Sequence, residues 1–316
     1  MREITILKND CNQRLDKFLG KLMPKMPSSL LQKSIRKGRV RINGKKITDA
    51  KHTVLLGDIL SLYINDEFFV LEPSKKDFLL APDEIDIVYE DENIILLNKK
   101  AGLAVHDFDG GGVDTLINRT LKHLYNKKEY DFENENAFTP ALCNRIDRNT
   151  CGIVIAAKNA EALRVMNELI KERKLTKKYL CLCSNTPKNK SGTLRFYMKK
   201  IESKNISLVS EKAKEGYKTA ITHYNVLKTN GKRSLVEIIL ETGRTHQIRA
   251  SFAHIGCPLL GDGKYGTNFA EDKKNGFPYQ ALCSYSLSFD FDDENELSYL
   301  KGKTFSIDDI WFKDKI

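Results

Sequence analysis

A short apolar run at residues 153–157, Ile-Val-Ile-Ala-Ala, is the feature that most restricts how this chain can fold. It is rich in β-branched residues and follows Gly152, so it predicts a buried strand. Just before it, Asp147 lies between Arg145 and Arg148. Opposite charges on both sides favour the ionised form of an acid, and a carboxylate kept charged can act as a nucleophile. The same residues could instead form a structural ion pair, and this stretch alone does not separate the two interpretations.

Predicted strands outnumber predicted helices in the rest of the chain. Because the two kinds of element do not alternate regularly, a doubly wound parallel sheet is disfavoured. We expect an α+β fold whose main domain is a mixed, largely antiparallel sheet. The predicted strands are residues 85–89, 94–98, 176–182, 219–228, 234–241 and 281–289, and the predicted helices are residues 115–125 and 160–171.

Positive charge is concentrated at the start of the chain. Residues 1–64 contain 14 lysines and arginines against 5 acids, a balance of +9, whereas the whole chain carries +10. This asymmetry is typical of a polyanion-binding module attached to a nearly neutral body, although a merely solvated basic surface would have the same composition. A chain of 316 residues is long enough for two domains.

The pattern within this basic region indicates a small folded module. Apolar residues at helical spacing predict two helices, the second beginning at a cap of Ser28 and Ser29. Asn43-Gly44 is a strong hairpin signal and predicts a small sheet after the helices. Over residues 12–64, this order resembles the αL RNA-binding module first described in a ribosomal protein of the small subunit. The helix face predicted to be apolar is Leu30, Leu31 and Ile35.

The cationic residues of the second helix and the hairpin are candidates for RNA binding. Such side chains contact phosphates in a sequence-independent way, so they supply affinity and orientation more than choice of base. We place this RNA-binding module at residues 1–64, a linker without clear period at 65–84 and the main domain at 85–316. The candidates are Lys33, Arg36, Lys37, Arg39 and Arg41.

Composition excludes several classes of protein. No apolar stretch approaches the ~18 residues of a membrane span, and the N-terminus lacks the apolar segment of a secretory signal. Seven cysteines, an odd number without C-x-x-C spacing, indicate reduced thiols in a cytoplasm. Cys181 and Cys183 would share one face of a strand. The six histidines do not cluster with the cysteines, so we expect no metal site and no membrane partner.

A second charged constellation lies at residues 241–249, Glu-Thr-Gly-Arg-Thr-His-Gln-Ile-Arg. Thr245 is a reasonable N-cap, so Arg249 would project from a helix start beside a strand end, which suits an anion. His246 could be a base or a metal ligand, but a hydrogen-bonded structural histidine is favoured.

Residues 261–266 match G-x-G-x-x-G without opening a βαβ unit, so dinucleotide binding is rejected. A triple glycine at 110–112 lacks a following G-K-S/T and predicts a flexible loop.

Several motifs together carry a resemblance to a known family. Arg145-Ile146-Asp147-Arg148, Lys178-Tyr179 and residues 243–249 are similar to the RluA-type pseudouridine synthases. The motifs occur in the family's order, and the N-terminal module matches the family's common RNA-binding extension. Further matching positions are Asn98, Lys99, Gly102, His106, Leu260, Gly261, Asp262, Tyr265 and Gly266. Departures are Lys100, Asn144, Asn149 and Cys151, where the family usually has Pro, His, Asp and Ser.

The resemblance implies an enzyme that needs neither a metal nor a cofactor. The reaction breaks the N-glycosidic bond of a uridine in RNA, turns the base over and rejoins it through carbon. Asp147 would be the nucleophile or the base acting at the ribose, and Arg249 would pair with it. Tyr179 would stack on the base and serve in proton transfer. Arg145 would fill the gap left by the flipped-out nucleotide, and Arg148 would be a further RNA contact.

The resemblance also implies a substrate class. Family members with this module mostly resemble modifiers of large-subunit ribosomal RNA, so we expect that RNA as the partner of a monomeric, cytoplasmic enzyme, with transfer RNA as the alternative. The uridine is chosen by RNA shape and loop contacts that no motif here specifies. A non-catalytic RNA-binding or ribosome-assembly factor with the same fold is the competing interpretation, followed by a hydrolase that would release free uracil.

Overall fold

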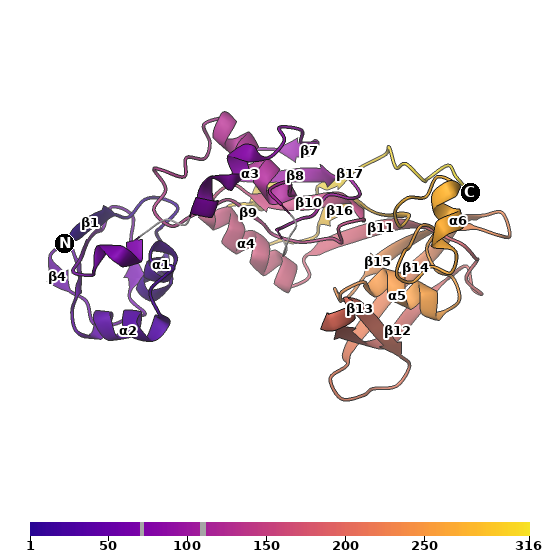
Figure 1. Ribbon diagram of the computed structural model, residues 1–316, viewed down its shortest axis with the longest axis horizontal. Helices are drawn as coiled ribbons and strands as arrows, with labels where there is room; N and C mark the ends of the chain where they lie inside the picture. The colour runs from indigo at the N-terminus through magenta and orange to yellow at the C-terminus, as the bar shows by residue number, and fades with distance from the viewer. Residues whose placement is uncertain (70–72, 108–111) are drawn as a thin grey trace.

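A small N-terminal module lies at one end of an elongated molecule, and a larger body forms the rest (Figure 1). The computed structural model describes residues 1–69, 73–107 and 112–316. Residues 70–72 of the predicted linker and Gly110 and Gly111 of the triple glycine lie outside the described residues. In the described ranges, none of the helices has the length and apolar character needed to cross a membrane.

The N-terminal module packs two helices with a four-stranded sheet of order β1-β6-β3-β4. Asn43 and Gly44 take positive φ angles of 50° and 78° between β3 and β4, which confirms the predicted hairpin turn. The elements are α1 (Leu15–Leu22), α2 (Ser28–Arg36), β1 (Arg2–Thr5), β3 (Val40–Ile42), β4 (Lys45–Lys46) and β6 (Ile59–Leu62), with a ribbon of β2 (Gln13–Arg14) and β5 (Thr53–Val54).

Two local predictions for this module are wrong. The N-cap of α2 is Pro27, and neither Ser28 nor Ser29 caps the helix because both already lie in its first turn. Leu31 and Ile35 are buried as predicted, but the side chain of Leu30 is 37% exposed. The apolar face of α2 is therefore narrower than the predicted one.

The described part of the predicted linker is structured. It contains two 3-10 helices, η1 (Asp66–Phe69) and η2 (Pro73–Leu80). Phe78 is buried in the core of the body, with its ring edge-on to those of Tyr125 and Phe132. This segment shows no periodic pattern because its buried residues in the described part, Phe69, Phe78 and Ala81, are not regularly spaced.

Polar contacts join the module to the body. The Asn9 amide nitrogen donates to Glu135 Oε1 at 2.8 Å, and the Asn136 amide nitrogen donates to Asp10 Oδ2 at 2.7 Å. The backbone nitrogen of Ala160 donates to Asn9 Oδ1 at 3.2 Å. The loop at residues 9–10 therefore fixes where the basic module stands relative to the body.

The body is built on one twisted sheet of order β13-β12-β14-β15-β11-β16-β10-β8-β7, with β17 on β16 and β9 on β10. Among the described strands, β10 and β16 pair in parallel and the other neighbours pair antiparallel. The fold is thus α+β with a mixed, largely antiparallel sheet, as predicted. The strands are β7 (Ile87–Glu90), β8 (Ile94–Lys99), β9 (Ala141–Leu142), β10 (Cys151–Ala157), β11 (Leu175–Cys183), β12 (Ser191–Ile201), β13 (Ile206–Ser210), β14 (Lys218–Thr229), β15 (Ser234–Leu240), β16 (Leu282–Phe289) and β17 (Thr304–Ser306).

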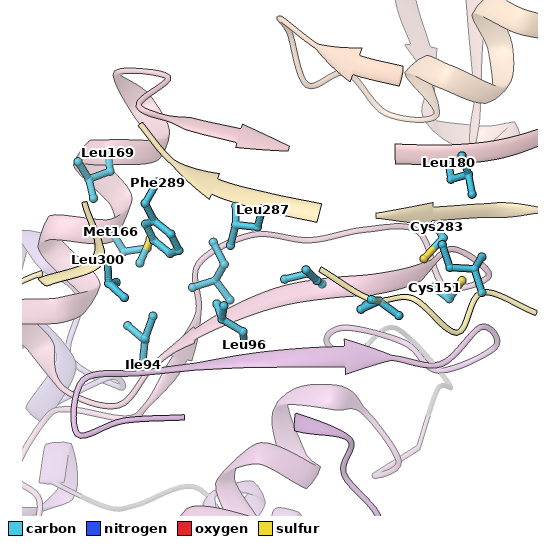
Figure 2. Close-up of a cluster of buried hydrophobic side chains, with 14 of the residues drawn as sticks. Ile94, Leu96, Cys151, Met166, Leu169, Leu180, Cys283, Leu287, Phe289 and Leu300 are labelled. Atoms are coloured by element: carbon cyan, nitrogen blue, oxygen red, sulfur yellow. The ribbon is translucent and has the colours of Figure 1, made fainter. Parts of the chain in front are cut away.

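The strand β10 lies inside this sheet between β16 and β8, and all seven of its residues are buried. Ile153 and Ile155 face the cluster that contains Met166 of α4, whereas Val154 faces the cluster of α3. Figure 2 shows Met166 and Leu169 gathered with Phe289 of β16 in the first cluster. Both faces of β10 are covered, and for this reason its sequence is a continuous apolar run. The helices of the body are α3 (Leu116–Asn126), α4 (Ala160–Lys171), α5 (Gln247–His254) and α6 (Phe269–Lys274).

The main elements of the body agree with the predicted ones. The helix α4 has the predicted bounds, and the sulfur atoms of Cys181 and Cys183 lie 3.7 Å apart on one face of β11. All seven cysteines are free thiols. The hairpin of β12 and β13 was not predicted, because exposed lysines interrupt the alternation of apolar and polar residues on which a strand assignment depends.

Gly152 in β10 permits a close approach of two strands and gives a stability prediction. Its φ is +115°, and a Cβ atom there would lie 2.6 Å from the backbone nitrogen of Ser284 and closer still to its carbonyl oxygen. Gly152→Ala should therefore lower the free energy of unfolding by about 3 kcal/mol or more, measured by urea denaturation. Gly231→Ala is the matched control, because φ is +86° there and a Cβ would meet nothing within 4 Å. It should cost only about 1 kcal/mol, and equal effects would contradict the steric explanation.

Candidate active site

A cleft of about 800 Å³ collects the three residues proposed for chemistry. Asp147 comes from the loop before β10, Tyr179 from β11 and Arg249 from α5. Arg145 and Arg148 also line it. Side chains that are up to 104 positions apart in the sequence, counted between Arg145 and Arg249, thus meet around one cavity.

Backbone hydrogen bonds and the buried side chain of Lys99 hold the loop that carries Asp147. The carbonyl oxygen of Arg148 accepts from Lys99 Nζ at 2.7 Å and from the backbone nitrogen of Gly102 at 3.0 Å. Lys99 is fully buried, and burial lowers its pKa to about 7. The backbone nitrogen of Thr150 donates to the carbonyl oxygen of Asp147 at 3.0 Å. These bonds restrict the direction in which the Asp147 carboxylate can point.

The helix α5 presents Arg249 in its first turn, but its start differs from the predicted one. Its N-cap is His246, which has a left-handed φ of 55°, and not Thr245. Among the described residues, the His246 side chain makes no capping hydrogen bond, and Gln247 Oε1 accepts from the backbone nitrogen of Arg244 at 3.0 Å in the turn before the helix. The Gln247 amide nitrogen donates to the carbonyl oxygen of Ile221 at 3.0 Å, which ties α5 to β14.

The Arg249 guanidinium bridges two carboxylates. Nε and Nη2 each donate to Asp262 at 2.8 Å, and Nη1 donates to Asp147 Oδ2, also at 2.8 Å. The side chains of Arg249 and Asp262 are 6% and 0% exposed, whereas that of Asp147 is 28% exposed at the cleft. Burial opposes the positive charge of Arg249, but the bonds and charges of Asp262 and Asp147 outweigh it and raise its pKa.

The counter-charge of Asp147 therefore comes from α5 and not from its neighbours in the sequence. Arg148 Nε donates to the carbonyl oxygen of Gly102 at 2.9 Å, and Arg145 is exposed at the cleft. The expectation that these two arginines hold the acid is thus wrong, because the extended loop points their side chains elsewhere. Among the described residues, Asp147 Oδ1 has no hydrogen-bond partner, so its lone pairs are available to a molecule in the cleft.

Tyr179 lies where β11 departs from regular pairing. The register with β16 shifts between Lys178 and Tyr179, and such a bulge re-aims a side chain. The Tyr179 side chain is 8% exposed and lines the cleft. Burial raises the pKa of its phenol to about 12, so it is protonated near neutral pH and can donate a hydrogen bond or stack on a base.

Asp262, Tyr265 and His246 surround the pair of Asp147 and Arg249, and the sequence assigned a role only to His246. Asp262 accepts from the backbone nitrogens of Lys264 and Tyr265 as well as from Arg249. His246 Nδ1 lies 2.9 Å from the Tyr265 hydroxyl, as expected of a hydrogen-bonded histidine. Its Nε2 lies only 3.8 Å from Asp147 Oδ2, which no spacing indicated. The turn at residues 261–266 matches the family pattern, but that match did not indicate which residues it would bring near Asp147.

Two departures from the family pattern have structural roles here. Asn144 Oδ1 accepts from the backbone nitrogen of Ile155 at 2.8 Å, which fixes the loop to β10. Cys151 is buried, and its sulfur donates to the carbonyl oxygen of Leu282 at 3.5 Å. Neither side chain is among those that line the cleft.

The candidate RNA contacts of the N-terminal module lie far from the cleft, since the module and α5 stand toward opposite ends of the molecule (Figure 1). Lys33, Arg36, Lys37 and Arg39 are exposed. Arg41 is half-buried, with its guanidinium carbon 5.3 Å from the centre of the Tyr63 ring. Further cations that were not predicted line the cleft itself: Lys200, Arg244 and Lys264.

A smaller hollow of about 370 Å³ adjoins the cleft and shares Ala104 and Arg148 with it. Its charged residues are mostly paired with one another, as in the bonds of Arg119 to Asp114. In the part of the chain that the structure describes, no three His, Cys, Asp or Glu side chains gather to hold a metal ion. The larger cleft offers a carboxylate, a phenol and guanidinium groups for chemistry.

Comparison with known families assigns both parts of the chain. The family described as RNA pseudouridylate synthase matches residues 93–254, and the S4 domain family matches residues 13–60. The first match covers the loop of Asp147, the strand of Tyr179 and all of α5. The second covers both helices of the N-terminal module and its hairpin.

Curated relatives are similar over most of their length. An uncharacterised RNA pseudouridine synthase of Bacillus subtilis, YlyB, is 31% identical over 91% of this chain and 89% of its own. The ribosomal large subunit pseudouridine synthases C and D of two Buchnera aphidicola strains are each 32% identical. The alignment covers 91% of this chain and 88% of the relative for the first, and 87% and 86% for the second.

Solved structures share the fold. Human RNA pseudouridylate synthase domain containing 4 superposes with a TM-score of 0.56 at 21% identity, over 72% of this chain and 90% of that one. Its paralogue domain containing 1 gives a TM-score of 0.54 at 22% identity, over 67% and 81%. With the family matches and the relatives above, these findings make the chain an enzyme of the isomerase class. It belongs to the RluA-type RNA pseudouridine synthases and carries an N-terminal S4 domain.

Proposed function

We propose that this enzyme isomerises uridines of large-subunit ribosomal RNA and that Asp147 is its nucleophile. The observation that best supports this role is the asymmetry of the Asp147 carboxylate. Arg249 holds Oδ2 at 2.8 Å, whereas Oδ1 has no hydrogen-bond partner among the described residues and borders the 800 Å³ cleft. Attack on a ribose carbon requires a carboxylate oxygen that is held in position but makes no hydrogen bond of its own to the protein.

The proposed reaction rearranges one bond. Asp147 Oδ1 bonds to C1′ as the C1′–N1 bond breaks, and the electron pair of that bond leaves with the uracil. The base turns over, C5 bonds to C1′ as the bond to Asp147 breaks, and the proton on C5 is lost while N1 gains one. No electron donor or acceptor is needed. The protonated phenol of Tyr179 supplies a stacking surface and a hydrogen-bond donor next to the base.

The target nucleotide has to leave its helix to reach Asp147, since the carboxylate lies inside a cleft. Arg145 is exposed at the mouth of the cleft, so its guanidinium is available to occupy the vacated position. Lys200, Arg244 and Lys264 line the same cavity and can meet the neighbouring phosphates.

The substrate class is proposed from the relatives and from the charge distribution. Two relatives similar over most of the chain are named for the large ribosomal subunit. The S4 domain concentrates positive charge far from the cleft, which suits an extended RNA that contacts both parts at once. We further propose that the enzyme acts as a monomer in the cytoplasm, where its seven free thiols would stay reduced.

Asp147→Asn should abolish isomerisation and leave RNA affinity almost unchanged, because the carboxylate acts on the ribose and not on phosphates. The rate of tritium release from RNA labelled at C5 of uridine should fall by about 10³-fold or more. Cells that lack the enzyme should lose pseudouridines in large-subunit ribosomal RNA and regain them with the wild type but not with this variant. Substantial turnover by the variant would contradict the role of Asp147, and missing pseudouridines in transfer RNA instead would contradict the substrate class.

Arg249→Met should destabilise the protein most near neutral pH. Burial raises the pKa of Asp262, but the bonds and charge of Arg249 and two backbone amides lower it more, so its folded pKa lies below its ordinary value. A lowered carboxyl pKa stabilises the fold above the ordinary value of about 4, and this contribution is lost as the pH falls through the folded pKa. The variant leaves Asp262 buried without its counter-charge, which costs roughly 3–5 kcal/mol.

Urea unfolding at pH 7 and pH 4 measures this difference between wild type and Arg249→Met. The deficit should be smaller at pH 4, because protonation of Asp262 removes the uncompensated charge in the variant. Arg164→Met is the control, since Arg164 is exposed on α4, and it should change stability little at either pH. A deficit that is equal at both pH values would mean that Arg249 stabilises by packing alone.

The S4 domain should set the salt dependence of RNA binding. Replacement of Lys33, Arg36 and Lys37 by Gln should weaken binding and reduce the slope of log affinity against log salt by about 0.7–0.9 for each phosphate that is no longer neutralised. The matched control replaces Lys171, Lys303 and Lys313, which are equally exposed and line neither cavity. An unchanged slope in the first variant, measured by filter binding, would show that these residues are not the RNA anchor.

A further inference from the structure

A chain of hydrogen bonds ends at the His246 imidazole beside Asp147. The backbone nitrogen of Ser207 in β13 donates to the Tyr265 hydroxyl oxygen at 2.6 Å, and that oxygen lies 2.9 Å from His246 Nδ1. The Ser207 hydroxyl donates to the carbonyl oxygen of Thr245 at 2.6 Å. Tyr265 thus accepts from an amide, and its own proton can be donated to Nδ1.

The other ring nitrogen of His246, Nε2, favours the same tautomer, in which Tyr265 donates to Nδ1 and the ring proton is on Nε2. His246 Nε2 faces Asp147 Oδ2 at 3.8 Å, which is too long for a hydrogen bond but close enough for a strong electrostatic contact. If Nδ1 carried the proton, the Nε2 lone pair would face a carboxylate and repel it. If Nε2 carries the proton, its N–H dipole stabilises the carboxylate without competing with Arg249 for it.

The surroundings keep the ring neutral and in place. The His246 side chain is 6% exposed, and burial lowers its pKa to about 4. The charged groups around the ring act on its pKa in opposite directions. Asp147 and Asp262 favour protonation of the ring, whereas Arg249 and Lys264 oppose it. The backbone of His246 is held at a left-handed φ of 55°, which is uncommon for a residue other than glycine and fixes where the ring starts. Strain of this kind at a site is a reason to look for a role.

We propose that His246 is a positioning residue for Asp147, held by Tyr265 as the neutral tautomer that carries its proton on Nε2. Together with Arg249, its N–H keeps Oδ2 turned away from the cleft and leaves Oδ1 to face the ribose. The effect on turnover rests on the proposed role of Asp147. The assignment of the tautomer does not, because it concerns the enzyme without RNA.

The tautomer is measured by ¹⁵N NMR on the full-length protein labelled at histidine. Near pH 7 the His246 ring should show a protonated Nε2 and an unprotonated Nδ1, with the signal identified by its disappearance in His246→Asn. Tyr265→Phe removes only the hydroxyl that donates to Nδ1, so the two tautomers should mix and the midpoint of ring protonation should rise. Tyr299→Phe is the control, since it removes a remote hydroxyl bonded to Asp91 and should change neither signal.

Kinetics test the positioning role with a conservative substitution. Asn tolerates the left-handed backbone and places an oxygen near the Nδ1 position, where it can accept from Tyr265, but it has no group at Nε2. His246→Asn should therefore fold normally and lower kcat by about tenfold, because Asp147 loses the electrostatic contact with Nε2, while KM for RNA changes by less than about threefold. Tyr265→Phe should lower kcat less, because the tautomer that carries its proton on Nε2 is still partly populated.

Each of these measurements has an outcome that would contradict the proposal. A proton on Nδ1, or an imidazolium near pH 7, would overturn the tautomer assignment. A kcat of His246→Asn within about twofold of the wild type would overturn the positioning role. If the wild type formed no pseudouridine at all, the proposed function would fail, and the NMR result would still decide the state of His246.

Discussion

The buried Arg249 guanidinium is the interaction on which the site depends. Moving a guanidinium into the protein interior is costly, and the bidentate bond to Asp262 offsets this cost with charge and with matched geometry. Asp262 is itself held by two backbone amides, so the pair is rigid. The third donor group of the same guanidinium is then available to Asp147. The same side chain therefore makes a structural ion pair with Asp262 and holds the acid that is proposed to react, so the two interpretations of an Arg-Asp pair do not exclude each other.

The rest of the fold brings Arg249 next to the loop that precedes β10 and carries Asp147. The strand β10 is covered on both faces, so the loop before it cannot move without disturbing two clusters of the core. Lys99 and Gly102 fasten the loop at the carbonyl oxygen of Arg148. The Asp147 carboxylate is consequently presented by a rigid scaffold, as its proposed role as a nucleophile requires.

Binding and chemistry are separated in space. The S4 domain carries almost all of the excess positive charge and stands away from the cleft, whereas the cleft has its own smaller set of cations. The polar contacts of Asn9 and Asp10 set the distance between the two parts. Selection of RNA by shape becomes possible in this arrangement, since only an RNA that reaches both surfaces gains the full electrostatic energy.

The sequence by itself determined what depends on neighbours in the chain. The apolar run of β10, the bounds of α4, the Asn43-Gly44 turn and the charge of the S4 domain all follow from local pattern, and residue types in order were enough to indicate the family. Only the tertiary structure decided which charge partners Asp147, because Arg249 and His246 approach it across about a hundred residues of chain. Thr245 suggested the wrong cap, because the residue pattern does not show the left-handed turn at His246. Flanking arginines suggested the wrong partner, since the bonds of Arg249 to Asp262 and Asp147 exist only after the sheet has assembled.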